Sequence, residues 1–167
     1  GDYDYTSARI RSLNQGDFKY GRVEASIKMA NTGGLWHAFW LLPSSPSESW
    51  PTSGEIDIME YVGNSPEQII NAAHFADQFE NHSFLTATSP FFNDNGFHVY
   101  AMEWNENQIT WYVDGEQTFA VSRNNPQIIN TWPFDAEFHI LLNVAVGGQL
   151  GGNVDAPALI IPRTMEV

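Results

Sequence analysis

The sequence predicts an all-β protein, an antiparallel β-sandwich of the jelly-roll kind. Three observations carry this prediction. Apolar and polar residues alternate with a period of two in many segments, turn-forming residues separate those segments, and no segment shows a convincing 3.6-residue helical period. With 167 residues the chain has the length of one domain with a sizeable core.

The strands follow from this alternation and from their boundaries. In residues 22–29, four apolar side chains alternate with four polar ones, as in a strand buried on one face. Asp114-Gly115 favours the type I′ turn of a hairpin between residues 109–113 and 117–121. Residues 138–146 have a small or polar second face and end at Gly147-Gly148. The other strands are predicted at residues 6–13, 36–42, 55–61, 69–75 and 98–104.

Loops are predicted where turn-forming residues gather, at 43–51, 63–66 and 93–96. Residues 126–132 are the one place for a short helical turn. Sandwiches of this kind often have roughly 200 to 250 residues. Residues 164–167 begin an apolar strand and stop within it, so we expect residues 1–167 to be a single, partial domain that lacks strands at both termini.

Composition limits the partners. The formal net charge is −13, and 43% of residues are hydrophobic, which is too apolar for a disordered acidic chain. We expect no binding to nucleic acid or to anionic membranes, because no basic surface is available to neutralise phosphates. No stretch is apolar enough to span a membrane, and no leader opens the chain, so we expect any signal peptide to have been removed. Cysteine is absent, which excludes disulfides and thiolate sites.

The most informative segment is residues 54–61, Gly-Glu-Ile-Asp-Ile-Met-Glu-Tyr. On a regular strand Glu55 and Asp57 share one face, and Glu60 points to the other. A β-bulge at Ile58-Met59 adds one residue and returns Glu60 to the face of the first two. The sequence therefore predicts three carboxylates that point the same way.

Two plain interpretations compete with a functional one. The acids form a solvated strand face, or they bind calcium, although one strand lacks the enclosing carbonyl ligands that calcium requires. Trp36, Trp40 and Trp50 lie just upstream of the acids. Aromatic rings pack on the C–H faces of a pyranose while acids meet its hydroxyls, so this combination favours a sugar ligand.

The segment resembles the bulged E-x-D-x-x-E active-site signature of glycoside hydrolase family 16, in its laminarinase (endo-β-1,3-glucanase) branch. Other segments resemble that family in the same order. They are Tyr-Gly-Arg-Val-Glu-Ala at 20–25, Gly-Leu-Trp-His-Ala-Phe-Trp-Leu-Leu at 34–42, Phe-His-Val-Tyr-Ala-Met-Glu-Trp at 97–104, Trp-Tyr-Val-Asp-Gly at 111–115 and Leu-Asn-Val-Ala-Val-Gly-Gly at 142–148. The resemblance covers nearly the whole chain, and it implies the concanavalin-like form of the jelly-roll sandwich. Two positions depart from it, because His37 stands where the family usually has Pro and residues 30–32 replace a Pro-containing turn, so we expect a reshaped loop at one end of the cleft.

The resemblance implies an endo-acting retaining hydrolase of β-1,3-glucan that works by double displacement. In such enzymes the two carboxyl groups lie about 5 to 5.5 Å apart. By resemblance Glu55 is the nucleophile and Glu60 the general acid/base, while Asp57 holds and tunes the pair. Glu60 must begin protonated, so we expect neighbouring negative charge to raise its pKa towards about 6 while hydrogen bonds keep Glu55 ionised.

Several other residues are candidates for substrate binding, and each also has a structural interpretation. His74 matches a family position near the leaving-group side, and Asn143 resembles a sugar-binding Asn, although a strand His or a buried amide is as often structural. Trp36, Trp40 and Trp104 are candidate stacking platforms, and Trp50 lies in a Pro-flanked loop. Trp111 is expected in the core or on the opposite face.

Several functions remain open at this stage. A mixed-linkage glucan, agar, porphyran or carrageenan is an alternative substrate, and transglycosylation an alternative reaction. A catalytically silent glycan-binding sandwich and a calcium-stabilised structural sandwich are alternatives from other classes. We expect no required cofactor, with any structural calcium site of the family incomplete here, a monomeric state, a polysaccharide substrate and an extracellular or periplasmic location.

Overall fold

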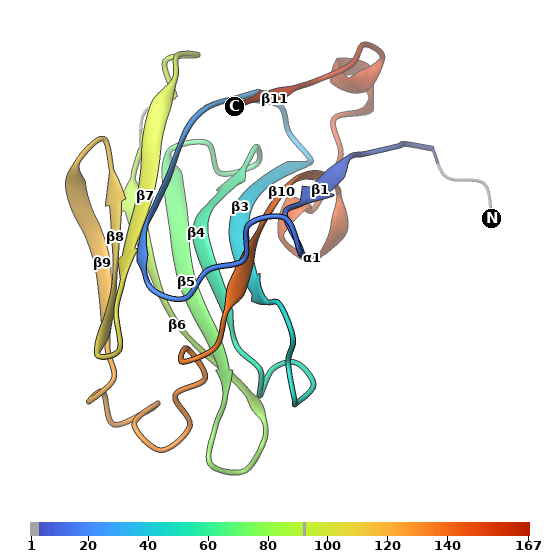
Figure 1. The fold of residues 1–167 in the computed structure, drawn as a ribbon. Coiled ribbons are helices and arrows are strands. Elements are labelled where there is room, and N and C mark those ends of the chain that lie inside the picture. Colours follow the sequence, from blue (N-terminus) through green and yellow to red (C-terminus); the bar gives the residue numbers. More distant parts are fainter. Residues whose placement is uncertain (1–3, 92) are drawn as a thin grey trace.

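The computed structural model describes residues 4–91 and 93–167 and contains two antiparallel β-sheets that pack face to face, which confirms the predicted sandwich (Figure 1). Sheet A has the strand order β1-β10-β3-β4-β5-β6, and sheet B has the order β11-β2-β7-β8-β9. The strands of sheet A are β1 (Arg9–Arg11), β10 (Phe138–Val146), β3 (Leu35–Pro43), β4 (Glu55–Val62), β5 (Gln68–Ala76) and β6 (His82–Pro90). Those of sheet B are β11 (Met165–Glu166), β2 (Gly21–Met29), β7 (His98–Trp104), β8 (Gln108–Val113) and β9 (Glu116–Ser122).

Most predicted strands are confirmed within one or two residues at each end. The β8–β9 hairpin turns at Asp114 and Gly115, whose φ angles are +50° and +85°. A type I′ turn requires positive φ at both central residues, so Asp-Gly is well suited to this place.

Three local predictions need correction. The first strand is only three residues long rather than eight, because just Arg9–Arg11 pair with β10. Strand β6 was missed because its alternation is inverted, with Phe84 exposed while the small Ser83 and Ala87 turn inward. The short helices α1 (Gly148–Gly151) and η1 (Ala156–Leu159) were also missed.

The core lies between the sheets. Sheet A contributes fully buried side chains such as Phe39, Ile56 and Phe75, and sheet B contributes Tyr100 and Trp111. Burial of large apolar side chains supplies most of the stabilisation of such a sandwich. The other face of sheet A points away from sheet B, and the three acidic residues of β4 are found there. Within the described residues, none of the helices is long and apolar enough to cross a membrane.

Candidate active site

The predicted β-bulge is present in β4. Asp57 pairs with Ala72 of β5 and Glu60 pairs with Ile70, so three steps along β4 match two steps along β5. The pairing between β4 and β3 shifts at the same place. The extra residue restores the parity of the strand and brings Glu60 to the face that carries Glu55 and Asp57.

Side chains from two other strands hold the bulge. Asn71 of β5 donates from Nδ2 to the carbonyl oxygen of Ile58 at 2.8 Å, and Trp111 of β8 donates from Nε1 to the carbonyl oxygen of Asp57 at 2.8 Å. The hydroxyl of Thr118 donates to Oδ1 of Asn71 at 2.8 Å and so fixes the orientation of the amide. A bulge removes backbone groups from the ladder, and buried groups without partners are costly. These bonds therefore stabilise the irregular backbone that aims Glu60.

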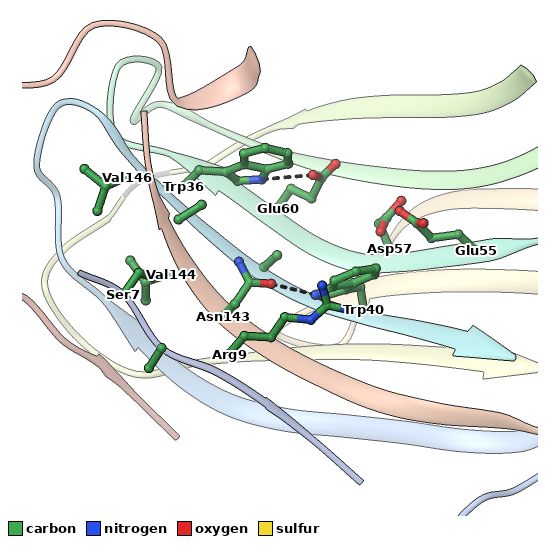
Figure 2. Close-up of a pocket in the computed structure, with 13 residues that line it drawn as sticks. Ser7, Arg9, Trp36, Trp40, Glu55, Asp57, Glu60, Asn143, Val144 and Val146 are labelled. Atoms are coloured by element: carbon green, nitrogen blue, oxygen red, sulfur yellow. Dashed lines mark hydrogen bonds between the residues drawn. The ribbon is translucent and has the colours of Figure 1, made fainter. Parts of the chain in front are cut away.

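The three acids line one pocket of about 490 Å³ on the outer face of sheet A (Figure 2). Trp36 and Trp40 of β3 and Asn143 of β10, all candidate substrate-binding residues, line the same pocket, and β1 adds Arg9. Pockets of this size are typical of small-ligand sites. The fold thus gathers side chains from four strands that are distant in sequence.

Both tryptophans of the pocket make polar contacts through their indole nitrogens. Nε1 of Trp36 donates to Oε1 of Glu60 at 3.0 Å, and Nε1 of Trp40 donates to Oδ1 of Asn143 at 2.8 Å (Figure 2). The guanidinium of Arg9 lies over the ring of Trp40, 4.7 Å from the centroid. Each indole is therefore fixed in orientation, and one of them is bonded to a candidate catalytic carboxyl.

Burial raises the pKa values of all three acids, and the charge of Asp57 raises those of Glu55 and Glu60 further. Burial, followed by the charge of Asp57, raises the pKa of Glu55 to about 7. The same two causes raise the pKa of Glu60 above that of Glu55, although the bond from Trp36 opposes this. Burial raises the pKa of Asp57, and a hydrogen bond with Glu55 opposes the rise. The three acids therefore keep protons to a higher pH than exposed carboxyl groups do, and they titrate together.

This result differs in one respect from the expectation for Glu55. A fully ionised nucleophile was expected, but burial gives Glu55 a pKa of about 7, so it is only partly ionised at neutral pH in the free protein. His74 and, after it, Trp50 oppose this rise in the pKa of Glu55 in part. The raised pKa of Glu60 suits a residue that must begin protonated.

His74 lies beside the acids, outside the pocket, on β5. It pairs directly with Glu55 across the sheet, and its Nε2 atom lies 3.0 Å from Oδ2 of Asp57. Glu55, Asp57 and His74 offer ligand atoms that all lie within 4.8 Å of one another, so this trio is where the described residues could hold a divalent ion. Oδ2 of Asp57 is buried and accepts no hydrogen bond in the structure, although Nε2 of His74 lies close to it.

Trp104 is a correction to the predicted set. It belongs to β7 of sheet B, is only 2% exposed and donates from Nε1 to the carbonyl oxygen of Phe134 at 3.0 Å. Its side chain packs between the sheets, so it cannot stack on a ligand in the pocket. Trp111 lies in the core, as expected.

Three residues near the acids are not indicated by the sequence patterns, namely Arg9, Asn71 and His82. Nε2 of His82 lies 2.9 Å from Nδ1 of His74. Arg9 reaches the pocket only because β1 pairs with β10, and nothing local in the sequence indicates that pairing. Asn71 could have been predicted from the bulge. A bulge leaves carbonyl groups of a buried strand unpaired, and such groups require donors from neighbouring strands.

Comparison with known proteins places this geometry in context. A family model described as "Glycosyl hydrolases family 16" matches residues 2–155. A glucan endo-1,3-beta-glucosidase A1 of Niallia circulans is 36% identical to this chain, and the match covers 98% of this chain and 25% of that protein. A beta-glucanase of Rhodothermus marinus is also 36% identical, and the match covers 98% of this chain and 60% of that protein. The X-ray structure of the laminarinase from Rhodothermus marinus superposes with a TM-score of 0.86, at 32% identity, over 99% of this chain and 70% of that one. The chain thus spans a quarter to three fifths of the length of these curated relatives.

Proposed function

The chain belongs to family 16 of the glycosyl hydrolases, and on that premise we propose that it is an endo-acting hydrolase of β-1,3-glucan that retains the anomeric configuration. The observation that supports this most directly is the bulge in β4, which gathers Glu55, Asp57 and Glu60 at one pocket with indole and amide side chains. Relatives whose names specify endo-1,3-glucan cleavage support the choice of substrate.

The first step forms a glycosyl ester. The carboxylate of Glu55 attacks the anomeric carbon of the sugar in the pocket, and the bond from that carbon to the bridging oxygen breaks. Glu60, whose pKa is raised by burial, gives its proton to the departing oxygen. Asp57 lies between the two and supplies the negative charge that helps to keep Glu60 protonated.

The second step releases the sugar. Glu60, now a carboxylate, removes a proton from a water molecule, whose oxygen attacks the anomeric carbon and breaks the ester with Glu55. Two inversions at the same carbon give net retention. Water and two carboxyl groups account for every bond made and broken, so we propose that turnover requires no cofactor and survives treatment with EDTA.

The charge of the site supports a neutral glycan. The pocket carries three acidic side chains against one basic residue, Arg9, which already lies over the ring of Trp40. A sulfated galactan would therefore meet net repulsion, although burial and shared protons reduce the charge of the acids. Polysaccharides such as β-1,3-glucan do not cross membranes. We therefore also propose that the protein acts in the extracellular or periplasmic space.

The test is a reducing-sugar assay on laminarin, mixed-linkage glucan, agarose and carrageenan, with Glu55→Ala and Glu116→Ala beside the wild type. Glu116 is an exposed residue at the start of β9 and serves as the matched control. We expect release of reducing ends from laminarin, loss of it in Glu55→Ala and normal activity in Glu116→Ala. Laminarin binding without cleavage by the wild type would favour the silent glycan-binding alternative, and NMR of early products showing inversion would refute the two-step reaction.

A further inference from the structure

Two of the acids and a histidine of β5 offer a set of metal-ligand atoms. Glu55, Asp57 and His74 each contribute one such atom, and these atoms all lie within 4.8 Å of one another. The carboxyl groups of Glu55 and Asp57 lie side by side (Figure 2). His74 is the direct partner of Glu55 across β4 and β5, and His82 lies on the next strand, β6. The set thus combines two carboxylates and one imidazole on paired strands.

One atom of this set is a buried oxygen without a partner. Asp57 is only 3% exposed, and its Oδ2 atom accepts no hydrogen bond. Nε2 of His74 lies 3.0 Å from this oxygen without forming a hydrogen bond to it. A buried polar atom without a partner is costly, and an ion is one of the ligands that removes the cost. Asp57 also lines the pocket, so an ion can reach it from solution.

His82 controls which nitrogen of His74 is available. Nδ1 of His74 lies 2.9 Å from Nε2 of His82, and one hydrogen must lie between the two nitrogens at this distance. When Nδ1 donates that hydrogen, Nε2 of His74 carries a lone pair beside Oδ2 of Asp57. Two electron-rich atoms in such a position repel each other, and a cation between them removes the repulsion. Metal-binding histidines characteristically donate their other ring N–H to a neighbouring group, which is the role that His82 can fill.

We propose that Glu55, Asp57 and His74 bind a divalent transition-metal ion such as Zn²⁺, and that this ion inhibits the hydrolysis proposed above. Zinc binds carboxylate oxygens and imidazole nitrogens at about 2.0 to 2.2 Å. Two ligand atoms with nearly perpendicular bonds of that length lie roughly 3 Å apart. The 3.0 Å between His74 and Asp57 matches this separation. Rotation of the Glu55 carboxyl group, on the same face of the sheet, brings in a third ligand.

The donor set selects the class of metal. Calcium and magnesium prefer shells of oxygen ligands, whereas an imidazole beside carboxylates suits zinc, copper and nickel. The sequence has no Lys or Arg between residues 29 and 122, a range that includes β4, β5 and β6. No basic residue of these strands therefore competes with a metal ion for the acids. The formal net charge of −13 also favours the approach of cations.

An ion in this place would block the first chemical step. The oxygen of Glu55 that attacks the anomeric carbon would be bound to the metal, so no glycosyl ester would form. The glycan and the ion compete for the same carboxyl group, so the inhibition should be competitive with laminarin. The chain has no cysteine, so inhibition by these ions cannot come from thiolates. The inhibition rests on the proposed function, whereas binding of the ion does not.

The binding test is calorimetric titration with Zn²⁺ in excess Ca²⁺, which occupies non-specific acidic sites. We expect the wild type to bind one Zn²⁺, and His74→Gln to lose this binding. His82→Leu should weaken it by about 10- to 100-fold, because loss of a group that orients a metal ligand typically has this effect. The matched control is His98→Gln, which should bind Zn²⁺ like the wild type, since His98 contacts other carboxylates, those of Asp94 and Asp114. Equal affinity in the wild type, His74→Gln and His82→Leu would overturn the proposed site, as would displacement of Zn²⁺ by Ca²⁺.

The activity test measures laminarin hydrolysis with and without Zn²⁺. We expect a loss of activity that EDTA reverses, with an apparent inhibition constant that rises with the laminarin concentration. This constant should increase in His82→Leu by the same factor as the dissociation constant of Zn²⁺. Tight binding without inhibition of an active enzyme would overturn the inhibitory role.

A spectroscopic measurement tests the site even if the protein cleaves no glucan. Co²⁺ in place of Zn²⁺ should give visible absorption bands that report on its ligands. We expect these bands to change in Glu55→Ala and to disappear in His74→Gln, while His98→Gln keeps the wild-type spectrum. Bands that are the same in the wild type, Glu55→Ala and His74→Gln would show that the ion binds elsewhere.

Discussion

The indole nitrogen of Trp36 donates a hydrogen bond to Oε1 of Glu60 at 3.0 Å. This contact joins the start of β3 to the acidic residue that follows the bulge of β4. It opposes the effects of burial and of Asp57, which raise the pKa of Glu60. A tryptophan predicted as a stacking platform is thus also a regulator of the proton that the proposed reaction requires.

Replacement of Trp36 by Phe should move the alkaline limb of the curve of kcat/KM against pH. The lost bond stabilises the ionised form of Glu60, so its removal raises the pKa further, and the protonated form persists to higher pH. We expect the falling limb of kcat/KM against pH to shift upwards. Trp40→Phe is the control, because Trp40 bonds Asn143 instead of an acid, and an unmoved limb in Trp36→Phe would contradict this account.

Replacement of Glu60 by Gln should impair catalysis in a way that depends on the leaving group. Loss of general acid/base assistance costs typically about 10²- to 10⁴-fold. We expect such a loss on laminarin, but little loss in the first step with a dinitrophenyl glycoside, whose leaving group needs no proton. Azide should restore turnover and yield a β-glycosyl azide, detected by mass spectrometry and NMR. The same loss on both substrates would show that Glu60 is not the proton donor.

Replacement of Asn71 by Leu should loosen the bulge. The carbonyl of Ile58 would lose its buried donor, at a cost of about 1 to 3 kcal/mol in the free energy of unfolding, measured by denaturant titration. Because the bulge aims Glu60, laminarin cleavage should fall more than cleavage of the dinitrophenyl glycoside. Thr118→Val, which removes only the bond to Asn71, should cause a smaller change of the same kind. A stability loss with equal effects on both substrates would mean that Asn71 does not position the acid.

Replacement of His37 by Leu should reduce sensitivity to acid. His37 is fully buried in β3, where burial lowers its pKa to about 4. The unfolded chain, with a pKa near 6.5, binds more protons in this interval, so the free energy of unfolding falls as the pH drops from about 6.5 to about 4. The contribution of His37 is on the order of 3 kcal/mol. We expect the free energy of unfolding of the wild type to fall relative to that of His37→Leu over that pH range. Parallel curves of unfolding free energy against pH for the two proteins would contradict this role of His37.

His98 offers a control of opposite sign for this experiment. Burial lowers its pKa, but contacts with Asp114 and Asp94 outweigh burial and raise it. Stability from such a group is present below the unfolded pKa and is lost as the pH rises through the folded one. His98→Gln should therefore change the pH dependence in the direction opposite to His37→Leu. His37 itself lies within β3, where its ring packs 5.8 Å from that of Tyr61.

Local patterns were sufficient for most of the fold. Alternation defined β2 and β10, and Asp-Gly defined the β8–β9 turn, because both signals depend on neighbours in sequence. The parity of Glu55, Asp57 and Glu60 even predicted the bulge. Strand β6 could not be predicted from alternation, because an edge strand can place small residues inward and an aromatic residue such as Phe84 outward.

The sequence by itself determined the all-β class, the acidic segment of β4 and the need for one extra residue within it. Only the tertiary structure decided that Trp104 is buried in the core, that Arg9 reaches the pocket, and that Asn71 and Trp111 hold the bulge. It also decided the burial that raises the pKa values of the three acids. The physical reason is that periodicity depends on adjacent residues, whereas hydrogen bonds, burial and pKa values depend on strands that meet only when the sheets are assembled.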